Sequence, residues 1–369
     1  MTRLPPFVTV VLPIRNEAGY IERSLGRLLA QDYPPNRMEI LVMDGMSDDA
    51  TRSIIERILS PGHAASVRVL DNPGRIVPVA MNLAVDEARG DVIVRVDGHT
   101  EVAPDYVRAC VESLEANAAA CVGGLMVARG STPFGEAVAL ATSHPLGVGG
   151  SRFHYASRVL ETDSVYLGAW RRRVFTEAGG FDEEMACNED DEFSYRLRST
   201  GRRIVLDPAI RSVYYNRSTV RGLWRQYFRY GLWKVRVAQK VPRQMRPRHV
   251  IPFAFVAALV GGGLLSFLSA PVRWGWLALV GTYAAVTLGV GVALARRAQG
   301  RLWWRLPGVF FILHTAYGTG FAVGLVRFAR LWRTPEAPRP RWPATAPRGR
   351  DGAGDPSRPP RTALGQGTR

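Results

Sequence analysis

Three long apolar segments in the last third of the sequence restrict the fold more than any other feature. They cover residues 250–270, 274–295 and 307–326. Each approaches the ~20 residues that an α-helix needs to cross the hydrocarbon core of a bilayer. Such segments are too long and too poor in charge for the core of a soluble domain. The sequence therefore predicts a membrane region at 250–329 with two or three transmembrane segments.

A basic segment directly precedes the first apolar run. Between Arg211 and His249 there are eleven arginines or lysines and no acidic residue, and the apolar and basic positions at 219–249 fit an amphipathic helix at the bilayer surface. Basic residues beside a membrane span favour the cytoplasmic face. We expect a multi-pass protein of the inner (plasma) membrane with a cytoplasmic soluble domain. A nucleic-acid surface would also be basic, but no nucleic-acid motif is present, so we expect no nucleic-acid partner.

The third apolar segment is the least regular. If the chain enters the membrane from the cytoplasm, the short loop at 271–273 lies outside and the arginines between 296 and 305 lie inside, as the positive-inside rule prefers. A full third crossing would then leave Arg327, Arg330 and Arg333 outside. A re-entrant or interfacial segment is therefore an alternative. Residues 330–369 are rich in proline and arginine, which predicts a disordered tail.

The N-terminal region alternates short β-rich runs with helical stretches, which predicts an α/β fold with a parallel sheet. The expected strands are residues 7–12, 39–43, 67–70 and 91–96, and the expected helices are 18–30, 48–59 and 78–88. The apolar run before Arg15 is too short for a signal peptide. The cysteines, at positions 110, 121 and 187, are odd in number and widely spaced, which predicts free thiols in a reducing compartment.

Polar side chains follow each expected strand. Glu17 comes after the first strand, Asp44 after the second, Asp71 after the third and Asp97 after the fourth. Ligands of parallel sheets bind beyond the carboxyl ends of the strands. These side chains are therefore expected at one shared rim, as a candidate binding site.

The spacing of five motifs resembles one family. They are VVLPIRNE (10–17), LVMDGMSDDAT (41–51), VRVDGHTEVAPDYV (94–107), GGFDEEMACNEDDEFSYRL (179–197) and RQYFRYG (225–231). In this order they are similar to the motifs of family 2 inverting glycosyltransferases with the GT-A fold, and their wording is similar to succinoglycan and exopolysaccharide members. The resemblance implies a Rossmann-like nucleotide-sugar-binding catalytic domain at 1–218.

The resemblance also implies a UDP-sugar donor and a divalent metal, Mn²⁺ or Mg²⁺. The donor-binding residues it implies are Pro13, Glu17, Asp44, Arg75, Asn82 and Asp97. The family's Asp-x-Asp motif appears here as Asp97, Gly98 and His99. Asp97 and His99 are thus the expected metal ligands, and an imidazole ligand favours Mn²⁺ over Mg²⁺.

Asp190 matches the family's general base, which takes the proton of the acceptor hydroxyl. An acidic helix start is also favoured by the helix dipole alone. The residues expected at the acceptor and the diphosphate are Gly168, Ala169, Trp170, Glu189, Gln226 and Arg229. Trp170 is expected either to stack on a sugar or to pack in the core. Tyr230 replaces the tryptophan of the family's Gln-x-x-Arg-Trp motif, so we expect addition of a single sugar rather than processive synthesis.

These inferences predict transfer of a hexose to a polyprenyl-diphosphate-linked glycan in exopolysaccharide or cell-envelope synthesis, with other polysaccharide-assembly proteins as possible partners. Two alternatives remain: transfer to polyprenyl phosphate itself, and a nucleotide-sugar-binding scaffold without activity. The changes at His99 and Tyr230 keep the scaffold alternative open. A transporter is disfavoured because the apolar segments contain no charged pathway.

Overall fold

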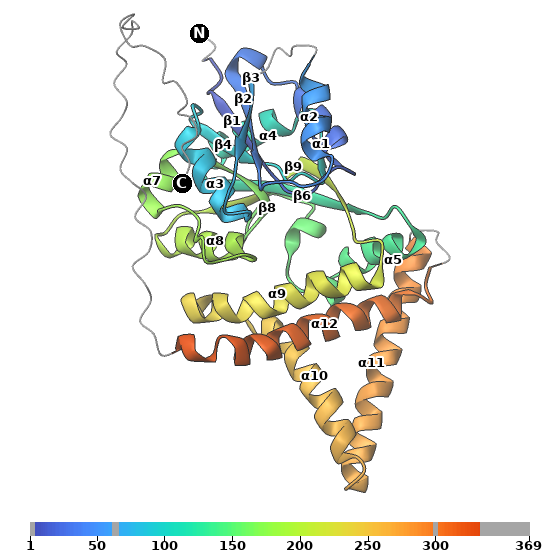
Figure 1. The fold of residues 1–369 in the computed structure, drawn as a ribbon. Helices are drawn as coiled ribbons and strands as arrows, with labels where there is room; N and C mark the ends of the chain where they lie inside the picture. Colours follow the sequence, from blue (N-terminus) through green and yellow to red (C-terminus); the bar gives the residue numbers. More distant parts are fainter. Residues whose placement is uncertain (1–3, 61–65, 298–301, 333–369) are drawn as a thin grey trace, which may run out of the picture.

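The structure is a computed structural model that describes residues 4–60, 66–297 and 302–332. It has three layers, which are an α/β layer, a pair of long helices below it, and a helical hairpin that projects away from both (Figure 1). Residues 329–332 form a short 3₁₀ helix, which includes the first three positions of the predicted tail. The rest of the predicted tail, from 333 on, lies outside the described residues.

The α/β layer, which later proves to be the catalytic layer, is built on a mixed sheet. Within the described residues its strands run in the order β3-β2-β1-β4-β8-β6-β9-β5, and β7 pairs with β9. The strands are β1 Val8–Ile14, β2 Met38–Asp44, β3 Ser66–Asp71, β4 Val92–Arg95, β5 Thr100–Val102, β6 Cys121–Arg129, β7 Leu160–Glu161, β8 Tyr166–Arg171 and β9 Ile204–Tyr215. Strands β1 to β4 are parallel to their neighbours within that group, and β8 is antiparallel to β4. The predicted parallel sheet is therefore one half of a mixed sheet.

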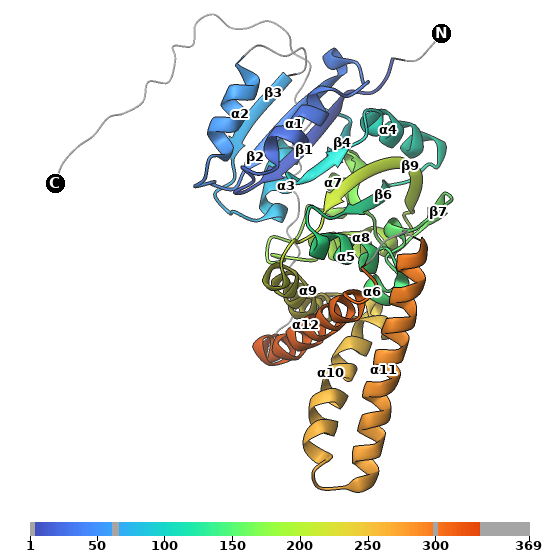
Figure 2. The same ribbon diagram turned by 90° about the vertical axis from the view of Figure 1, so that its right-hand side faces the viewer.

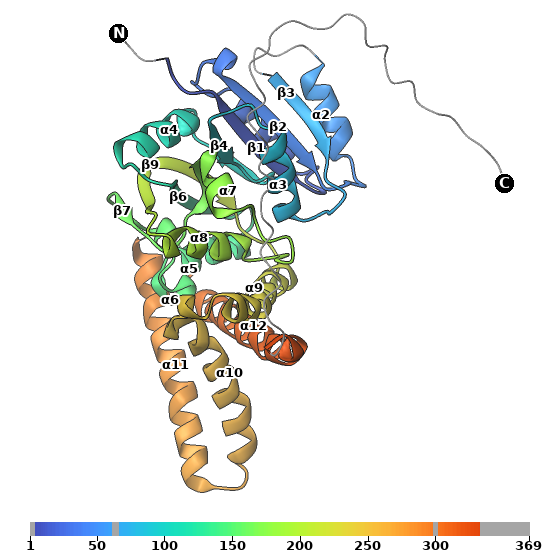
Figure 3. The same cartoon turned by 90° about the vertical axis from the view of Figure 1, so that its left-hand side faces the viewer.

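Helices cover both faces of this sheet, and β1, β2 and β4 are therefore buried along their whole length. Helices α1 (Ile21–Leu29), α2 (Thr51–Leu59) and α4 (Tyr106–Ala116) pack on one face, and α3 (Val77–Glu87), α7 (Arg173–Ala178) and α8 (Glu189–Ser199) pack on the other (Figures 2 and 3). Alternate residues of β1 divide between the two cores. Val10 and Leu12 face the first and Val11 faces the second. The four predicted strands and three predicted helices are present, with ends shifted by a few residues.

Two long helices lie side by side beneath the sheet, α9 (Val220–Lys240) and α12 (Leu306–Arg327) (Figure 1). The shorter α5 (Pro133–Thr142) and α6 (Pro145–Val148) pack beside them. Glycines allow the backbones of the long pair to touch. A Cβ at Gly320 would lie 2.0 Å from the Phe228 carbonyl oxygen, and one at Gly231 would lie 1.9 Å from that of Tyr317. The contact surface therefore depends on small residues at these positions.

The hairpin consists of α10 (Pro247–Leu265) and α11 (Ala270–Arg297). Large apolar side chains at its tip are exposed, with Phe267 87% and Leu268 83% accessible. Such exposure of apolar surface suits a lipid environment. By length and composition, α10, α11 and α12 are each able to cross a membrane.

The third apolar helix differs from the other two in its packing. None of the apolar window of α10 is buried by the rest of the protein, whereas half of that of α12 is buried. Helix α12 runs across the base of the hairpin rather than along it (Figures 1 and 3). This arrangement favours the interfacial alternative for residues 307–326 over a third crossing.

The close contact between α9 and α12 predicts a difference between two glycines of α12. Gly320→Ala should lower the free energy of unfolding by about 1–3 kcal/mol, because the new methyl group overlaps the Phe228 backbone. Gly308→Ala should be neutral or mildly stabilising, because no atom of a neighbouring element lies within 4 Å of the position that its methyl group would take. Denaturant unfolding in detergent would compare them. Equal stability of the two variants would contradict the packing.

The position of α12 also predicts the membrane topology. Single cysteines introduced at Arg296 and at Arg330, in a chain without its native cysteines, should both react with a membrane-impermeant maleimide from the side on which the catalytic domain lies. The reason is that an α12 lying along α9 does not carry the chain to the other side. Labelling of position 330 from the opposite side only would show that α12 crosses the bilayer.

Candidate active site

The ends of β2 and β3 are joined by one arginine. Arg52 of α2 forms ion pairs with Asp44 and Asp71, the last residues of these strands. Ser47 donates a hydrogen bond to the Asp44 carboxylate at 2.5 Å, and this carboxylate is fully buried. Asp44 therefore lies at the predicted rim, but its oxygens are already engaged. A contact with the base or ribose would require Arg52 or Ser47 to move.

A buried arginine connects the end of β4 to the start of α8. Arg95 Nε donates to Asp97 Oδ1 at 2.7 Å, and its Nη1 donates to Glu189 Oε1 at 3.0 Å. Burial lowers the pKa of Arg95, but the charges of Asp97 and Glu189 raise it overall. The guanidinium therefore stays charged. It draws the expected metal ligand Asp97 and the acidic start of α8 into one site.

Glu17 and His99 form the second pair of the site. His99 Nδ1 lies 2.9 Å from Glu17 Oε1. Gly98, between Asp97 and His99 in the sequence, packs against the end of β1 and the turn that follows it. A Cβ at this position would lie 2.8 Å from the Ile14 side chain and 2.9 Å from the Glu17 Cγ. Position 98 therefore excludes side chains. In the neutral tautomer whose Nδ1 donates to Glu17, the other ring nitrogen, Nε2, keeps its lone pair, which is the arrangement found in metal-bound histidines.

The first turn of α8 carries four acidic residues, Glu189–Glu192, here called the acidic turn. Asn188 precedes it in a left-handed conformation, φ 61°, and its side-chain amide donates to the Tyr230 carbonyl of α9. Burial, together with the charges of Asp191 and Glu189, raises the pKa of Asp190 to about 7. A carboxylate with a pKa near neutrality is suited to proton transfer at physiological pH.

Helix α9 supplies the opposite charge. Lys234 pairs with Asp191, and Lys240 pairs with Asp182, where the lysine side chains are only 9% and 8% exposed. Lys234 lowers the pKa of Asp191 despite the burial of that carboxyl. These are the two lysines of a sequence that otherwise uses arginine. The acidic turn is thus held against the helix that packs on the membrane region.

Gln226 of α9 joins a polar aromatic cluster under the sheet. Its amide donates to the hydroxyls of Tyr214 at 3.0 Å and Tyr230 at 2.9 Å. Tyr214 packs edge-on to His99, with ring centroids 5.5 Å apart. Gln226 and Tyr230 are therefore connected to the Glu17–His99 pair. Arg229, by contrast, is exposed and donates to the Ala186 carbonyl.

Two expected site residues are part of the core instead. Trp170 is 5% exposed and is surrounded by Phe175, Phe181 and Phe193, so it cannot stack on a sugar. The neighbouring Ala169 is completely buried in β8. The acceptor role predicted for these side chains is wrong because β8 is an inner strand with both faces covered. Gly168, with φ 144°, lies against the Trp170 ring and has no side chain to offer.

Asn82 is also engaged in the structure. Its amide donates to the Phe181 carbonyl at 2.9 Å and accepts from the Phe181 N–H at 2.8 Å, which ties α3 to the loop before α8. Only 8% of Asn82 is exposed, so the predicted donor contact conflicts with this geometry. Pro13 lies buried within β1, and Arg75 is exposed after β3 in a left-handed conformation. Their donor contacts stay predictions.

Comparison with known proteins decides the family. The family model "Glycosyl transferase family 2" matches residues 9–173. The succinoglycan biosynthesis protein ExoA of Rhizobium meliloti (strain 1021) is 34% identical over 328 residues, which cover 87% of this chain and 96% of that protein. The chain belongs to glycosyl transferase family 2.

Two further proteins extend the similarity of this glycosyltransferase. The dolichyl N-acetyl-alpha-D-glucosaminyl phosphate 3-beta-D-2,3-diacetamido-2,3-dideoxy-beta-D-glucuronosyltransferase of Methanococcus voltae is 27% identical, over 87% of this chain and 98% of that protein. The solved mannosyltransferase of Pyrobaculum calidifontis, in complex with GDP-Man and Mn²⁺, has a TM-score of 0.55 at 21% identity, and the match covers 85% of this chain and 87% of that one. The fold is therefore GT-A, as predicted.

Sequence reasoning missed two charged residues of the glycosyltransferase site, Arg95 and Lys234. Arg95 is an inward-facing arginine in an otherwise apolar strand, and a charge in that position signals a buried partner. Lys234 is one of two lysines among 48 basic residues, which is a weaker signal. Arg95 also pairs with Glu189, and Lys234 pairs with Asp191; both of these carboxylates are distant in sequence, so only the fold identifies these contacts.

Lys234 predicts a shift in the pH profile of the glycosyltransferase. Its positive charge lowers the pKa of Asp190, so Lys234→Met should move the acid limb of kcat/KM to higher pH. Lys240→Met removes the other lysine of α9 and should leave the limb in place. Lys234→Arg, which keeps the charge, should shift the limb less than Lys234→Met does. The same shift in both methionine variants would contradict a direct effect on the acidic turn.

Proposed function

We propose that this glycosyltransferase transfers a hexose from a UDP-sugar, with inversion, to a polyprenyl-diphosphate-linked glycan in exopolysaccharide or cell-envelope synthesis. The names of two relatives support this reading. One is a succinoglycan biosynthesis protein, and the other acts on a dolichyl-linked sugar phosphate. The exposed apolar hairpin beside the catalytic layer supports an acceptor that is delivered from a membrane.

The acidic turn carries this proposal. Inversion needs a base that removes the acceptor proton as the hydroxyl attacks the anomeric carbon. We assign this role to Asp190, because its pKa of about 7 provides both the unprotonated form that accepts the proton and a strong enough driving force for the transfer. Glu189, held by Arg95, fixes the acidic turn at the end of β4. Gln226 and Arg229 would face the acceptor and diphosphate side.

A divalent metal fits the Asp97–His99 pair, although the described residues contain no cluster of three or more metal-ligating side chains. The Glu17–His99 hydrogen bond prepares Nε2 as a ligand, and Asp97 supplies a carboxylate oxygen. When bound, such a metal would neutralise charge on the departing diphosphate, whose oxygens complete the coordination. A mixed nitrogen and oxygen set favours Mn²⁺. The related fold of the Pyrobaculum calidifontis enzyme holds Mn²⁺ with its nucleotide sugar.

We place the catalytic layer on the cytoplasmic face of the plasma membrane. The α10–α11 hairpin would insert into the bilayer, while α9 and α12 would lie at its surface. The basic residues between 211 and 249 gather on the same side as the catalytic layer, as the positive-inside rule requires. UDP-sugars are then available to the donor site.

The proposal predicts metal-dependent release of UDP that requires both acidic residues. Purified protein in detergent would be tested with a panel of UDP-sugars, Mn²⁺ or Mg²⁺, and a polyprenyl-linked glycan extract. Asp190→Asn should lower turnover by about 10²- to 10⁴-fold, the usual contribution of a general base. Asp97→Ala should abolish the metal-dependent release of UDP. Asp32→Asn, which removes an exposed ion pair with Arg108, should keep wild-type turnover.

The same assay separates the alternatives. Transfer to polyprenyl phosphate in place of the glycan extract would replace the proposed acceptor by the lipid phosphate itself. Donor binding without turnover, for every sugar and acceptor, would reject catalysis in favour of a scaffold. Turnover should also fall as the pH drops below about 7, because protonated Asp190 cannot accept the acceptor proton.

A further inference from the structure

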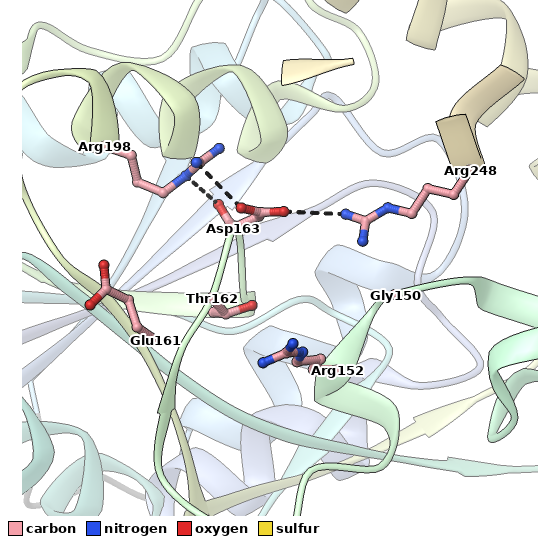
Figure 4. Close-up of a pocket in the computed structure, with 7 residues that line it drawn as sticks. All are labelled: Gly150, Arg152, Glu161, Thr162, Asp163, Arg198 and Arg248. Carbon is pink, nitrogen blue, oxygen red and sulfur yellow. Dashed lines mark hydrogen bonds and ion pairs between the residues drawn. The ribbon is translucent and has the colours of Figure 1, made fainter. Parts of the chain in front are cut away.

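A polar pocket of about 230 Å³ lies where the catalytic layer meets the first helix of the hairpin (Figure 4). Its lining comes from four separate parts of the chain. They are the loop that contains Gly150 and Arg152, the segment 161–163, helix α8 through Arg198, and helix α10 through Arg248. Pockets for drug-sized ligands usually exceed ~300 Å³. This one has room for a headgroup rather than for a whole nucleotide sugar.

The charge of the pocket is positive. Asp163 lies between Arg198, at 3.3 Å, and Arg248, at 3.4 Å (Figure 4), and Arg246 reaches the same carboxylate at 3.8 Å. Arg152 adds a fourth guanidinium. The other acid of the lining, Glu161, pairs with Arg203 outside the pocket. The lining thus holds three arginines and two acids, with Arg246 beside them, and this positive excess suits phosphate oxygens, which guanidinium groups bind through paired hydrogen bonds.

The pocket lies at the polar end of the hairpin. Arg248 is in the first turn of α10, and the sequence contains no charged residue between 250 and 272. The dipole at the start of this 19-residue helix also favours an anion. If the hairpin enters the bilayer, the arginines lie at the depth of the lipid phosphates.

The pocket also adjoins the acidic turn. Ser164, the next residue after Asp163, hydrogen-bonds to Asp191, and His249, the next after Arg248, interacts electrostatically with the same carboxyl. A phosphate bound between Arg152 and Arg248 would therefore lie beside Asp190 and its neighbours, with its lipid chain able to follow α10 into the membrane.

We propose that this pocket binds the phosphate headgroup of a membrane lipid, and that the lipid is the polyprenyl-linked acceptor. This assignment rests on the proposed function for the identity of the lipid, whereas anion binding itself does not. The phosphate of a bulk anionic phospholipid has the same chemistry, so the experiment must separate the two sources.

The test is equilibrium binding of radiolabelled farnesyl diphosphate to the full-length protein in neutral detergent. Arg152→Gln and Arg248→Gln should each weaken binding by about tenfold, as expected for the loss of one charge-assisted contact. Arg248→Lys should weaken it less, because the charge remains. Arg57→Gln, an exposed arginine of α2 paired with Glu22, should bind like the wild type. Equal affinity of all variants and the wild type would overturn the proposal.

Competition then identifies the source of the phosphate. Displacement of the label by polyprenyl phosphates but not by phosphatidylglycerol would assign the pocket to the acceptor, whereas equal displacement by phosphatidylglycerol would overturn that assignment in favour of a bulk-lipid site. UDP release in the absence of acceptor should be unchanged in the pocket variants, which also confirms that they fold. Because binding needs no turnover, a wild type that binds the label but transfers nothing would reject the proposed function and leave the anion site standing.

Discussion

The buried ion pair between Lys234 and Asp191 is the contact on which the rest of the site depends. Removing one partner of such a pair leaves an uncompensated buried charge, at a cost of about 3–5 kcal/mol. The pair joins the acidic turn of α8 to α9, and α9 in turn packs along α12. Three layers of the protein therefore meet at one charge contact. The position of the candidate base depends on the packing of helices that belong to the membrane region.

This connection explains why both lysines of the chain are on α9. An ammonium group on a flexible stem can reach a carboxylate inside a crowded helix interface, whereas a guanidinium needs space for its planar fork. Lys234 and Lys240 are both almost fully covered. Arg236 of the same helix, 13% exposed, shares the carboxylate of Glu184 with Lys240. Lys234 differs from both because its partner, Asp191, belongs to the acidic turn.

The sequence predicted the layers of the fold well because its signals were local. The strand and helix rhythm of the first hundred residues depends on apolar periodicity, and the ends of β1 to β4 place Glu17, Asp44 and Asp97 at one rim. The errors concern residues whose role depends on distant partners. The family resemblance assigned Trp170 to the acceptor, with the core as the alternative; strands β4 and β6 enclose β8, and the ring lies in the core.

The position of α12 also depends on a partner that is distant in sequence. Its length and mean hydropathy are those of a membrane span, as for α10, and the arginines that follow it were the local signal for an interfacial alternative. The difference arises from the small residues Gly231 and Gly320, which allow α9 and α12 to approach until their backbones touch. An apolar helix that can bury half of its surface against protein no longer needs lipid on every side. The partner of a helix, rather than its composition, therefore decides whether it crosses the bilayer or lies against the catalytic domain.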